Sequence, residues 1–192
     1  ARKGGAQLRY MKRALTPNQA LQLINHGPTI LVTAVGEKGA NIITLAWSMP
    51  VSIRPPLLAI SVSPHRYSHN LILNSGEFVV NIPNASLLRQ VHLCGTISGR
   101  NKDKFKEAGL TAIPASKVQA PLIEECIGHI ECKLRAHYTA GDHTIFIGEV
   151  VAGSVEEELY DGHLMTEKEE GETLHHLGGN VYAIAGRRVR AR

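Results

Sequence analysis

Residues 65–69, HRYSH, place two histidines, an arginine and two hydroxyl groups between apolar runs that are typical of buried strands. Arg66 carries a planar guanidinium, which suits the oxygens of a phosphate. Ser68 stands at the expected N-cap of a helix over residues 68–76, where backbone N–H groups lack partners and the helix dipole is positive. This pattern is typical of a phosphate site. The alternative is that Ser68 only caps the helix and Arg66 is solvated.

A second basic segment, SGRNKDKF at residues 98–105, leads into another expected helix over residues 101–109. Lys102 and Lys104 would lie in its first turn, where a positive charge opposes the helix dipole. Such lysines favour an anionic partner, although a charge run of this kind is often only solvated surface. Lys104 and Arg100 are therefore the next candidates for a phosphate contact.

The segment NIITLAWSMPVS at residues 41–52 contains the only tryptophan in the chain. Pro50 lacks a backbone donor, so the strand is expected to bend or to pair incompletely there. Unpaired backbone groups at such a bend can bind the polar edge of a flat heterocycle. The alternative is a tryptophan packed in the core. The residues next to the expected bend are Thr44, Ala46, Trp47 and Ser48.

Two histidine motifs remain. His143 follows Asp142 at a hairpin turn, where a histidine can donate a proton or orient a ligand. His175 and His176 are adjacent and would point to opposite faces of a strand. No pair of histidines shows the spacing of a catalytic zinc site backed by carboxylates, so no metal site is predicted.

Hydrophobic periodicity predicts a mainly β chain with short helices between antiparallel strands. Thr16 and Pro17 open a first short helix. Along residues 122–138, Cys126 and Cys132 alternate with polar side chains such as Glu131, which predicts a long half-buried strand. Hairpin connections favour a small closed antiparallel β-barrel over a doubly wound parallel fold. The other expected strands lie at residues 29–35, 42–53, 57–63, 77–82, 143–155 and 180–186; further helices are expected at 86–95 and 101–109, and a mobile loop at 167–172.

Composition indicates one globular domain over residues 11–186. Residues 1–10 are interpreted as a leader or an artificial extension, and residues 187–192 as a solvated basic tail. These two ends hold the positive net charge, so no nucleic-acid-binding patch is predicted. No apolar run reaches the length of a membrane span. The three cysteines lack zinc spacing and are expected as buried small side chains in a cytoplasmic protein.

In this order, five segments resemble the flavin reductase-like family of FMN-binding split β-barrels, and most closely its flavoredoxin branch. They are NIITLAWSMPVS, PPLLAISVSPHRYSHNLILNSGEFVVNIP, SGRNKDKFKEAGL, GDHTIFIGEV and HHLGGNVYAIAG. The resemblance runs from about residue 13 to residue 186. It implies a closed antiparallel split β-barrel with peripheral helices, and a homodimer that binds FMN near the subunit interface.

The resemblance also implies roles for individual residues. His143 would lie near the reacting edge of the flavin, where NADH, NADPH or another electron donor docks. Tyr182 would cover the ring. The residues expected beside the isoalloxazine ring and the ribityl chain are Thr44, Ala46, Trp47, Ser48, Ser61, Val62 and Ser63. Those expected around the phosphate are Arg66, Tyr67, Ser68 and Lys104.

The leading hypothesis is an FMN-dependent oxidoreductase, either an NAD(P)H:flavin reductase or a flavoredoxin-like carrier serving a small-molecule or protein electron donor and acceptor. The alternative is an FMN-binding storage or carrier protein without reductase turnover. Binding of nucleic acid through the two basic ends is a third hypothesis, which the charge distribution does not favour.

Overall fold

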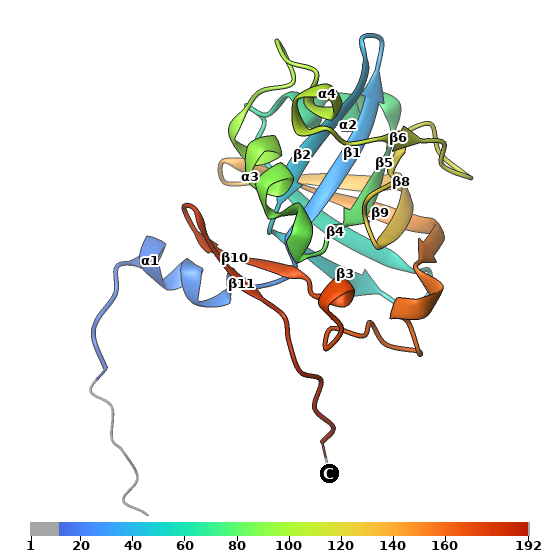
Figure 1. Cartoon of the computed structure of the whole chain (residues 1–192). Helices are drawn as coiled ribbons and strands as arrows, with labels where there is room; N and C mark the ends of the chain where they lie inside the picture. The colour runs from blue at the N-terminus through green and yellow to red at the C-terminus, as the bar shows by residue number, and fades with distance from the viewer. Residues whose placement is uncertain (1–11, 192) are drawn as a thin grey trace, which may run out of the picture.

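One antiparallel sheet of seven strands is the main element of the fold (Figure 1). The structure, a computed structural model, describes residues 12–191, and the expected leader lies outside them. The sheet order is β2-β1-β5-β8-β9-β4-β3, which confirms the prediction of a mainly β, antiparallel chain. Its strands are β1 (Ile30–Gly36), β2 (Gly39–Leu45), β3 (Ser48–Ser52), β4 (Leu57–Val62), β5 (Glu77–Ile82), β8 (Gly128–Ala140) and β9 (His143–Val155).

Short helices and two small hairpins surround this sheet. Among residues 12–191 no helix is long and apolar enough to cross a membrane. The α-helices are α1 (Pro17–Leu21), α2 (Tyr67–Ser75), α3 (Leu88–Thr96) and α4 (Lys104–Ala108). The 3-10 helices are η1 (Gln22–Ile24), η2 (Ala85–Leu87), η3 (Glu157–Leu159) and η4 (Glu169–Gly171), and the hairpins are β6 (Ala112–Ile113) with β7 (Leu122–Ile123) and β10 (Leu174–Gly178) with β11 (Val181–Ile184).

The two edge strands of the sheet, β2 and β3, are separated in the chain only by Ala46 and Trp47. In a flat sheet they would lie six strand spacings apart, roughly 29 Å, which two residues cannot span. The sheet therefore curls until its edges approach, and here the backbone N–H of Ser61 donates to the carbonyl of Trp47 at 3.0 Å. Within residues 12–191 no ladder joins β2 to β3, so hydrogen-bonded closure of a barrel is not shown.

This corner corrects one sequence prediction. The continuous arm expected over residues 42–53 is wrong, whereas the incomplete pairing expected at Pro50 agrees with a register shift between Pro50 and Ser52. Leu45 still pairs with Ile30 of β1, whereas Ser48 pairs with Ile60 of β4. The chain thus changes partner strand at Ala46 and Trp47, and Pro50 lies within the edge strand β3, where its missing donor costs little.

Helices α2 and α3 pack on opposite sides of β1. Side chains alternate along a strand, so both faces of β1 can be buried. Val32 packs with Ile72 of α2 in one apolar cluster, and Leu31 packs with Val91 of α3 in a second cluster. Both helices are thereby fixed against the strand that precedes β2 and its corner.

The hairpin of β8 and β9 was predicted, and its residues 143–155 agree with β9. Cys132 is buried as expected, but Cys126 lies in the turn before β8 and not in the strand. Glu131 was expected on the polar face and is instead 4% exposed. Its carboxylate accepts backbone hydrogen bonds from Ser116 at 2.9 Å and Lys117 at 2.6 Å, which offset the cost of burial.

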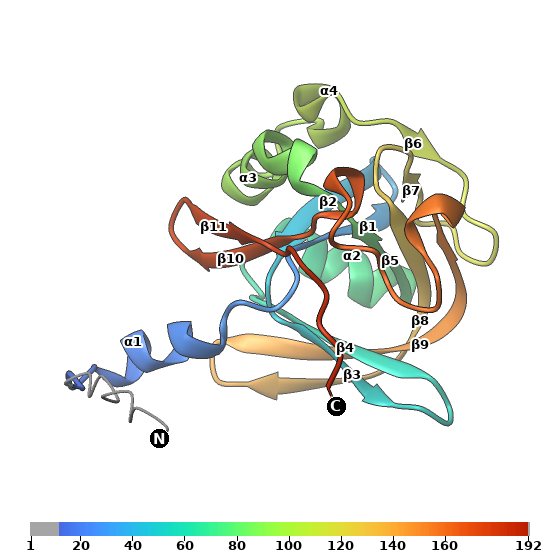
Figure 2. The same cartoon turned by 60° about the horizontal axis from the view of Figure 1, so that its bottom comes forward.

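The hairpin of β10 and β11 lies beside the segment that follows α1 (Figure 2). Pro28 forms an isolated bridge with His175, and the backbone N–H of Thr29 donates to the carbonyl of Leu174 at 2.7 Å. The segment that follows α1 and the C-terminal hairpin therefore meet on one side of the sheet.

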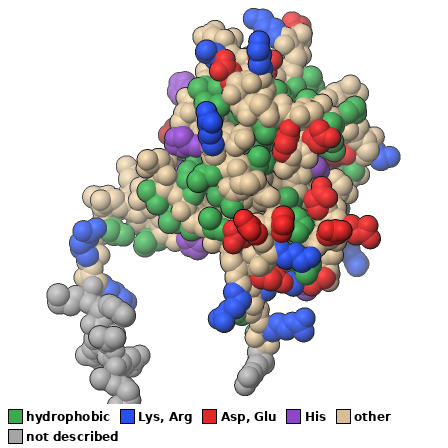
Figure 3. All heavy atoms as spheres, viewed as in Figure 1, with side chains coloured by type: hydrophobic (Ala, Val, Ile, Leu, Met, Phe, Trp, Pro, Cys, Tyr) green, Lys and Arg blue, Asp and Glu red, His purple; other side chains and the backbone are tan. Residues whose placement is uncertain are grey.

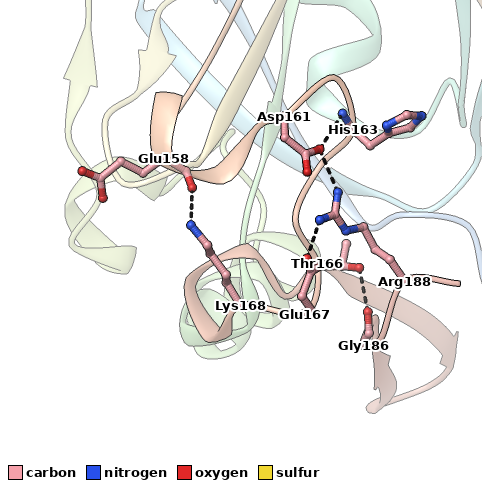
Figure 4. A network of polar contacts seen from close by, with 8 residues as sticks. All are labelled: Glu158, Asp161, His163, Thr166, Glu167, Lys168, Gly186 and Arg188. Atoms are coloured by element: carbon pink, nitrogen blue, oxygen red, sulfur yellow. Dashed lines mark hydrogen bonds and ion pairs between the residues drawn. The ribbon is translucent and has the colours of Figure 1, made fainter.

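The C-terminal segment is attached to the protein through Arg188. Its guanidinium forms ion pairs with Asp161, at 2.8 Å, and with Glu167 (Figure 4). Thr166 also donates its hydroxyl to the carbonyl of Gly186 at 2.7 Å. The prediction of a purely solvated basic tail is thus wrong for Arg188. Figure 3 shows acidic side chains gathered where this basic segment leaves the molecule. The loop expected at residues 167–172 contains the short helix η4.

Candidate functional site

A cavity of about 570 Å³ lies at the β2–β3 corner, and we call it the corner cavity. It is large enough for a drug-sized ligand. The end of β4, the start of α2, the turn between β8 and β9, and the C-terminal hairpin all contribute to its walls. Its lining residues are Asn25, Ile43, Thr44, Leu45, Ala46, Trp47, Ser61, Ser63, His65, Arg66, Gly95, His143 and His176.

A smaller cavity of about 170 Å³ adjoins it, and we call it the anion cavity. The two cavities share Ile43, His65, Arg66 and Gly95 in their linings, so they form one elongated site. The other residues of the anion cavity are Asn41, Tyr67, Ser68, Cys94, Thr96, Ile97, Ser98, Gly99, Arg100 and Lys104. The segments singled out from the sequence at residues 44–48, 61–68, 98–104 and 143 therefore meet in space.

The N-terminus of α2 forms the inner end of the anion cavity. Its N-cap is Arg66, whose side chain makes no capping bond, and Ser68 is the second helical residue, so the prediction of Ser68 as N-cap is wrong. Ser68 is buried, and its hydroxyl accepts a hydrogen bond from the Asn41 side chain at 2.8 Å, which offsets the cost of burying this polar group. Among residues 12–191 the backbone N–H groups of Tyr67 and Ser68 have no partner, and they point along the positive end of the helix.

Lys104 brings a buried cation to the same cavity. It is the first residue of α4, behind the N-cap Asp103, so Lys102 lies before the helix and not in its first turn as predicted. The Lys104 ammonium donates to the carbonyl of Cys94 at 2.6 Å and is otherwise enclosed. Burial lowers the pKa of Lys104 to about 8, the neighbouring Cys94 opposes this shift, and Arg66 adds to it. An anion in the cavity would restore the charged form of this lysine.

Trp47 and His143 lie together at the open side of the corner cavity. Their ring centroids are 4.9 Å apart, and nearly half of Trp47 is exposed, so the alternative of a core tryptophan is wrong. The Nδ1 atom of His143 lies 2.7 Å from a carboxylate oxygen of Asp142, whose pKa this hydrogen bond lowers. The bond fixes the imidazole and leaves Nε2 available to a ligand.

The backbone of the corner supplies further polar groups. Trp47 uses its carbonyl to accept from Ser61, but the N–H groups of Ala46 and Trp47 have no backbone partner within residues 12–191. Ala46 lines the corner cavity. The corner can therefore offer amide donors to the edge of a planar polar ligand.

Three residues expected beside the ring differ in the groups they can offer to a ligand. The Val62 side chain is 1% exposed and packs in the core, so only its backbone can border the site. Thr44 lines the corner cavity, but its hydroxyl already donates to the carbonyl of Val91 at 2.6 Å. Ser48 lines an apolar cavity that adjoins the corner cavity at Ala46 and Trp47, and it does not line the corner cavity itself.

Asn25 and His176 belong to the site, and no role was predicted for either of them from the sequence. Asn25 accepts a hydrogen bond from the Trp47 indole N–H and donates to Nδ1 of His176 at 3.4 Å. Nε2 of His176 then donates to the carbonyl of Gly179 at 2.9 Å. His176 also lies against Tyr182, with ring centroids 5.0 Å apart. The HH motif was a usable signal for His176, whereas no local pattern marked Asn25.

The two histidines of the HRYSH segment have different surroundings. His65 is exposed and lines both cavities. His69 is buried, hydrogen-bonds through Nε2 to the hydroxyl of Thr144 at 2.8 Å, and contacts Phe146 edge to face. His69 is thus a structural residue. Among residues 12–191 no three His, Cys, Asp or Glu side chains are grouped as metal ligands.

The sequence and the site together define the class of protein. Residues 24–180 match the family model described as the flavin reductase like domain. This span covers most of the chain and includes both cavities, so the chain belongs to the flavin reductase-like family, as its motifs indicated.

Individual relatives agree with this assignment. The chain is 35% identical over 180 residues to the uncharacterized protein YddH of Escherichia coli (strain K12), which covers 91% of this chain and 95% of that protein. An FMN-binding protein from Thermus thermophilus with bound p-hydroxybenzaldehyde superposes with a TM-score of 0.79 at 26% identity, covering 97% of this chain and 100% of that chain. Flavoredoxin of Desulfovibrio vulgaris (Miyazaki F) gives 0.78 at 26% identity, covering 96% of each chain.

Proposed function

We propose that the chain is an FMN-dependent oxidoreductase, working as an NAD(P)H:flavin reductase or as a flavoredoxin-like electron carrier. The observation that carries this proposal is the elongated site formed by the two adjoining cavities. One end gathers cations and free amide N–H groups, and the other end gathers Trp47, His143 and the free amides of the corner. Family membership and the FMN-binding protein that superposes on this fold support the same reading.

The residues present fit FMN at both ends. The phosphate would lie in the anion cavity, where Arg66, Lys104 and the N–H groups of Tyr67 and Ser68 are donors that meet no anionic acceptor among the described residues. The planar ring would lie in the corner cavity. Gly95 lines both cavities and marks where they adjoin, and a Cβ there would be in van der Waals contact with the Thr44 side chain.

The protein's own part in the reaction is binding and orientation. Bound FMN would supply hydride and electron transfer. Asp142 holds His143 so that Nε2 can orient an electron donor or hold a proton at the mouth of the corner cavity. The network from Trp47 through Asn25 to His176 joins the β2–β3 corner to the C-terminal hairpin and so fixes this wall of the corner cavity. The donor and acceptor are proposed as small molecules or proteins, with NADH or NADPH as the donor.

The visible absorption spectrum of the purified protein, with FMN added in excess and then removed, tests this proposal. We expect flavin absorption to remain with the protein at up to one FMN per subunit. A protein that stays colourless and does not quench the fluorescence of added FMN would overturn the proposal.

A second candidate is an FMN-binding carrier or storage protein without reductase turnover. The sequence contains no dinucleotide fingerprint, which is a weak argument for a carrier because the flavin reductase-like family does not use one. Anaerobic titration with NADH and NADPH separates the two. Rapid bleaching of the flavin absorption supports the reductase, whereas a flavin that bleaches only with a chemical reductant supports the carrier.

A homodimer is part of the proposal. Met49, Val51 and Ile53 of the edge strand and its turn are exposed, as are Leu21 and Ile24 near the N-terminus. Ile24 and Met49 line one apolar cavity, so part of this surface is continuous, and such patches mark protein interfaces. Sedimentation equilibrium of the full chain and of Met49→Glu tests it. We expect a dimer that the charge dissociates, and a monomeric unsubstituted chain would contradict the proposal.

The finer architecture and compartment are also proposed. Closure as a split barrel is supported by the approach of β2 and β3 at the Ala46–Trp47 corner. A reducing cytoplasm is supported by Cys94, Cys126 and Cys132, which are buried and free of disulfides.

A further inference from the structure

Arg100 crosses the outer side of the anion cavity. Its Nη1 donates to the carbonyl of His65 at 2.9 Å, and its guanidinium carbon lies 5.9 Å from the centroid of the Tyr67 ring. All three residues line the cavity, and Arg100 is exposed, so its side chain borders the cavity on a side that solvent reaches. The contact joins the loop between α3 and α4 to the loop between β4 and α2.

The backbone that carries Arg100 is held in place. Gly99 lies so close to Asn41 that a Cβ on residue 99 would stand 1.9 Å from the Asn41 side-chain oxygen. Asn41 in turn donates to the hydroxyl of Ser68 inside the cavity, and Arg100 N donates to the hydroxyl of Ser98 at 3.3 Å. The loop is thus seated on the same residues that form the floor of the anion cavity.

The position of Arg100 has a consequence for the ligand. The anion cavity has less than a third of the volume of the corner cavity, so it suits a terminal phosphate and not a further nucleoside. A ligand that continued beyond its phosphate on this side of the cavity would meet the contact between Arg100 and the His65 carbonyl. We infer that Arg100 makes this site selective for a flavin mononucleotide over a flavin dinucleotide. This inference rests on the proposed function, and it names Arg100 as the specificity-determining residue.

Binding of FMN, FAD and riboflavin to the full chain, followed by flavin fluorescence, tests the inference. We expect the unsubstituted protein to bind FMN at least about tenfold more tightly than FAD. Arg100→Lys keeps the charge but loses the planar fork that reaches both His65 and Tyr67. It should therefore tighten FAD binding severalfold in absolute terms while FMN binding changes little. Arg100→Ala should also tighten FAD binding, with some loss for FMN.

The matched control is Lys102→Ala, which removes a nearby exposed charge that pairs with Glu107 and does not line the cavity. It should leave the ratio of FMN to FAD affinities unchanged. Equal affinity of the unsubstituted protein for FMN and FAD would overturn the selectivity alone. Equal weakening of FMN and FAD by both Arg100 variants would show a plain charge contact and would also overturn it. A chain that binds none of the three flavins overturns the proposed function itself.

Discussion

The anion cavity and the corner cavity are lined by chemically different groups. The first is small and is enclosed by backbone amides and by the cations Arg66, Arg100 and Lys104. The second is larger and carries aromatic and imidazole groups, with Trp47 and His143 partly exposed. Charge fixed in a small enclosure is suited to holding a ligand, whereas exposed titratable groups are suited to reacting with a second molecule. Affinity and turnover should therefore respond to different substitutions.

The largest expected effect is at the corner cavity. We predict that His143→Gln lowers the rate of flavin reduction by NADH or NADPH by roughly 10²-fold, a typical contribution of a group that handles or directs a proton. FMN affinity should stay within about twofold, because His143 does not line the anion cavity, where the phosphate is proposed to bind. Anaerobic stopped-flow absorbance measures the rate, and fluorescence titration measures the affinity. An unchanged rate would show that His143 takes no part in flavin reduction, and it would contradict the assignment of turnover to the corner cavity.

The next effect is at the anion cavity. Arg66→Ala should weaken FMN binding about 10- to 100-fold, since a hydrogen bond to a charged group contributes roughly 1.5–3 kcal/mol. Riboflavin lacks the phosphate, so its affinity should change little. Isothermal titration calorimetry with both ligands checks this difference. Equal losses for the two ligands would place the phosphate elsewhere in the site.

Lys104 predicts a pH dependence of affinity. Its pKa is lowered to about 8 by burial, so in the free protein it is charged below this pH and neutral above it. A phosphate monoester is already a dianion there, because its second pKa is about 6. FMN affinity should thus fall, by up to about tenfold, as the pH rises through 8, while riboflavin affinity stays flat. Lys104→Met should abolish the slope, and a riboflavin curve with the same slope would assign it to another group.

A smaller loss of affinity is expected at Asn25 and tests whether the ring and the phosphate are bound in different cavities. Asn25→Ala removes the side chain that holds Trp47 and His176. It should weaken FMN and riboflavin alike, by about three- to tenfold, because it acts on the ring and not on the phosphate. Asn25→Asp keeps the acceptor for Trp47 and serves as the matched variant, with an intermediate loss. A larger loss of affinity for FMN than for riboflavin would contradict a role of Asn25 at the corner cavity.

The smallest effect should come from Arg188, which lines neither cavity. Arg188→Gln should leave affinity and rate unchanged and lower the melting temperature by about 1–3 °C at low salt. Arg188 lowers the pKa of Asp161 and of Glu167 below their ordinary values of 3.8 and 4.5. Their stabilisation is therefore present above about pH 4.5 and is lost as the pH falls through the lowered values. Calorimetry at neutral and acidic pH should show the difference between the variant and the unsubstituted chain only at neutral pH.

Local patterns predicted the strands well. Residues 77–82 and 143–155 agree with β5 and β9, because apolar alternation and turn residues bound both segments. The change of partner strand at Ala46 and Trp47 could not be read, since both halves of residues 42–53 have strand composition. Only the sheet order shows that they lie on opposite edges.

The site was predictable where its residues adjoin a helix start or a turn. Arg66, Lys104 and His143 stand at such positions, and each lines a cavity. Asn25 and His176 are 151 residues apart in sequence, so their contact left no local trace. Glu131 was placed by its polarity on an exposed face, and Ser68 was placed at the helix N-cap, but both side chains are buried and make long-range hydrogen bonds.

The corner between β2 and β3 also determines what spectroscopy can observe. The chain contains a single tryptophan, and it stands at this corner, in the wall of the corner cavity. Its ultraviolet emission therefore originates from one place, beside the proposed ring position and 4.9 Å from the imidazole of His143. A flavin seated there would absorb this emission, so the protein carries its own optical reporter of which end of the site is filled.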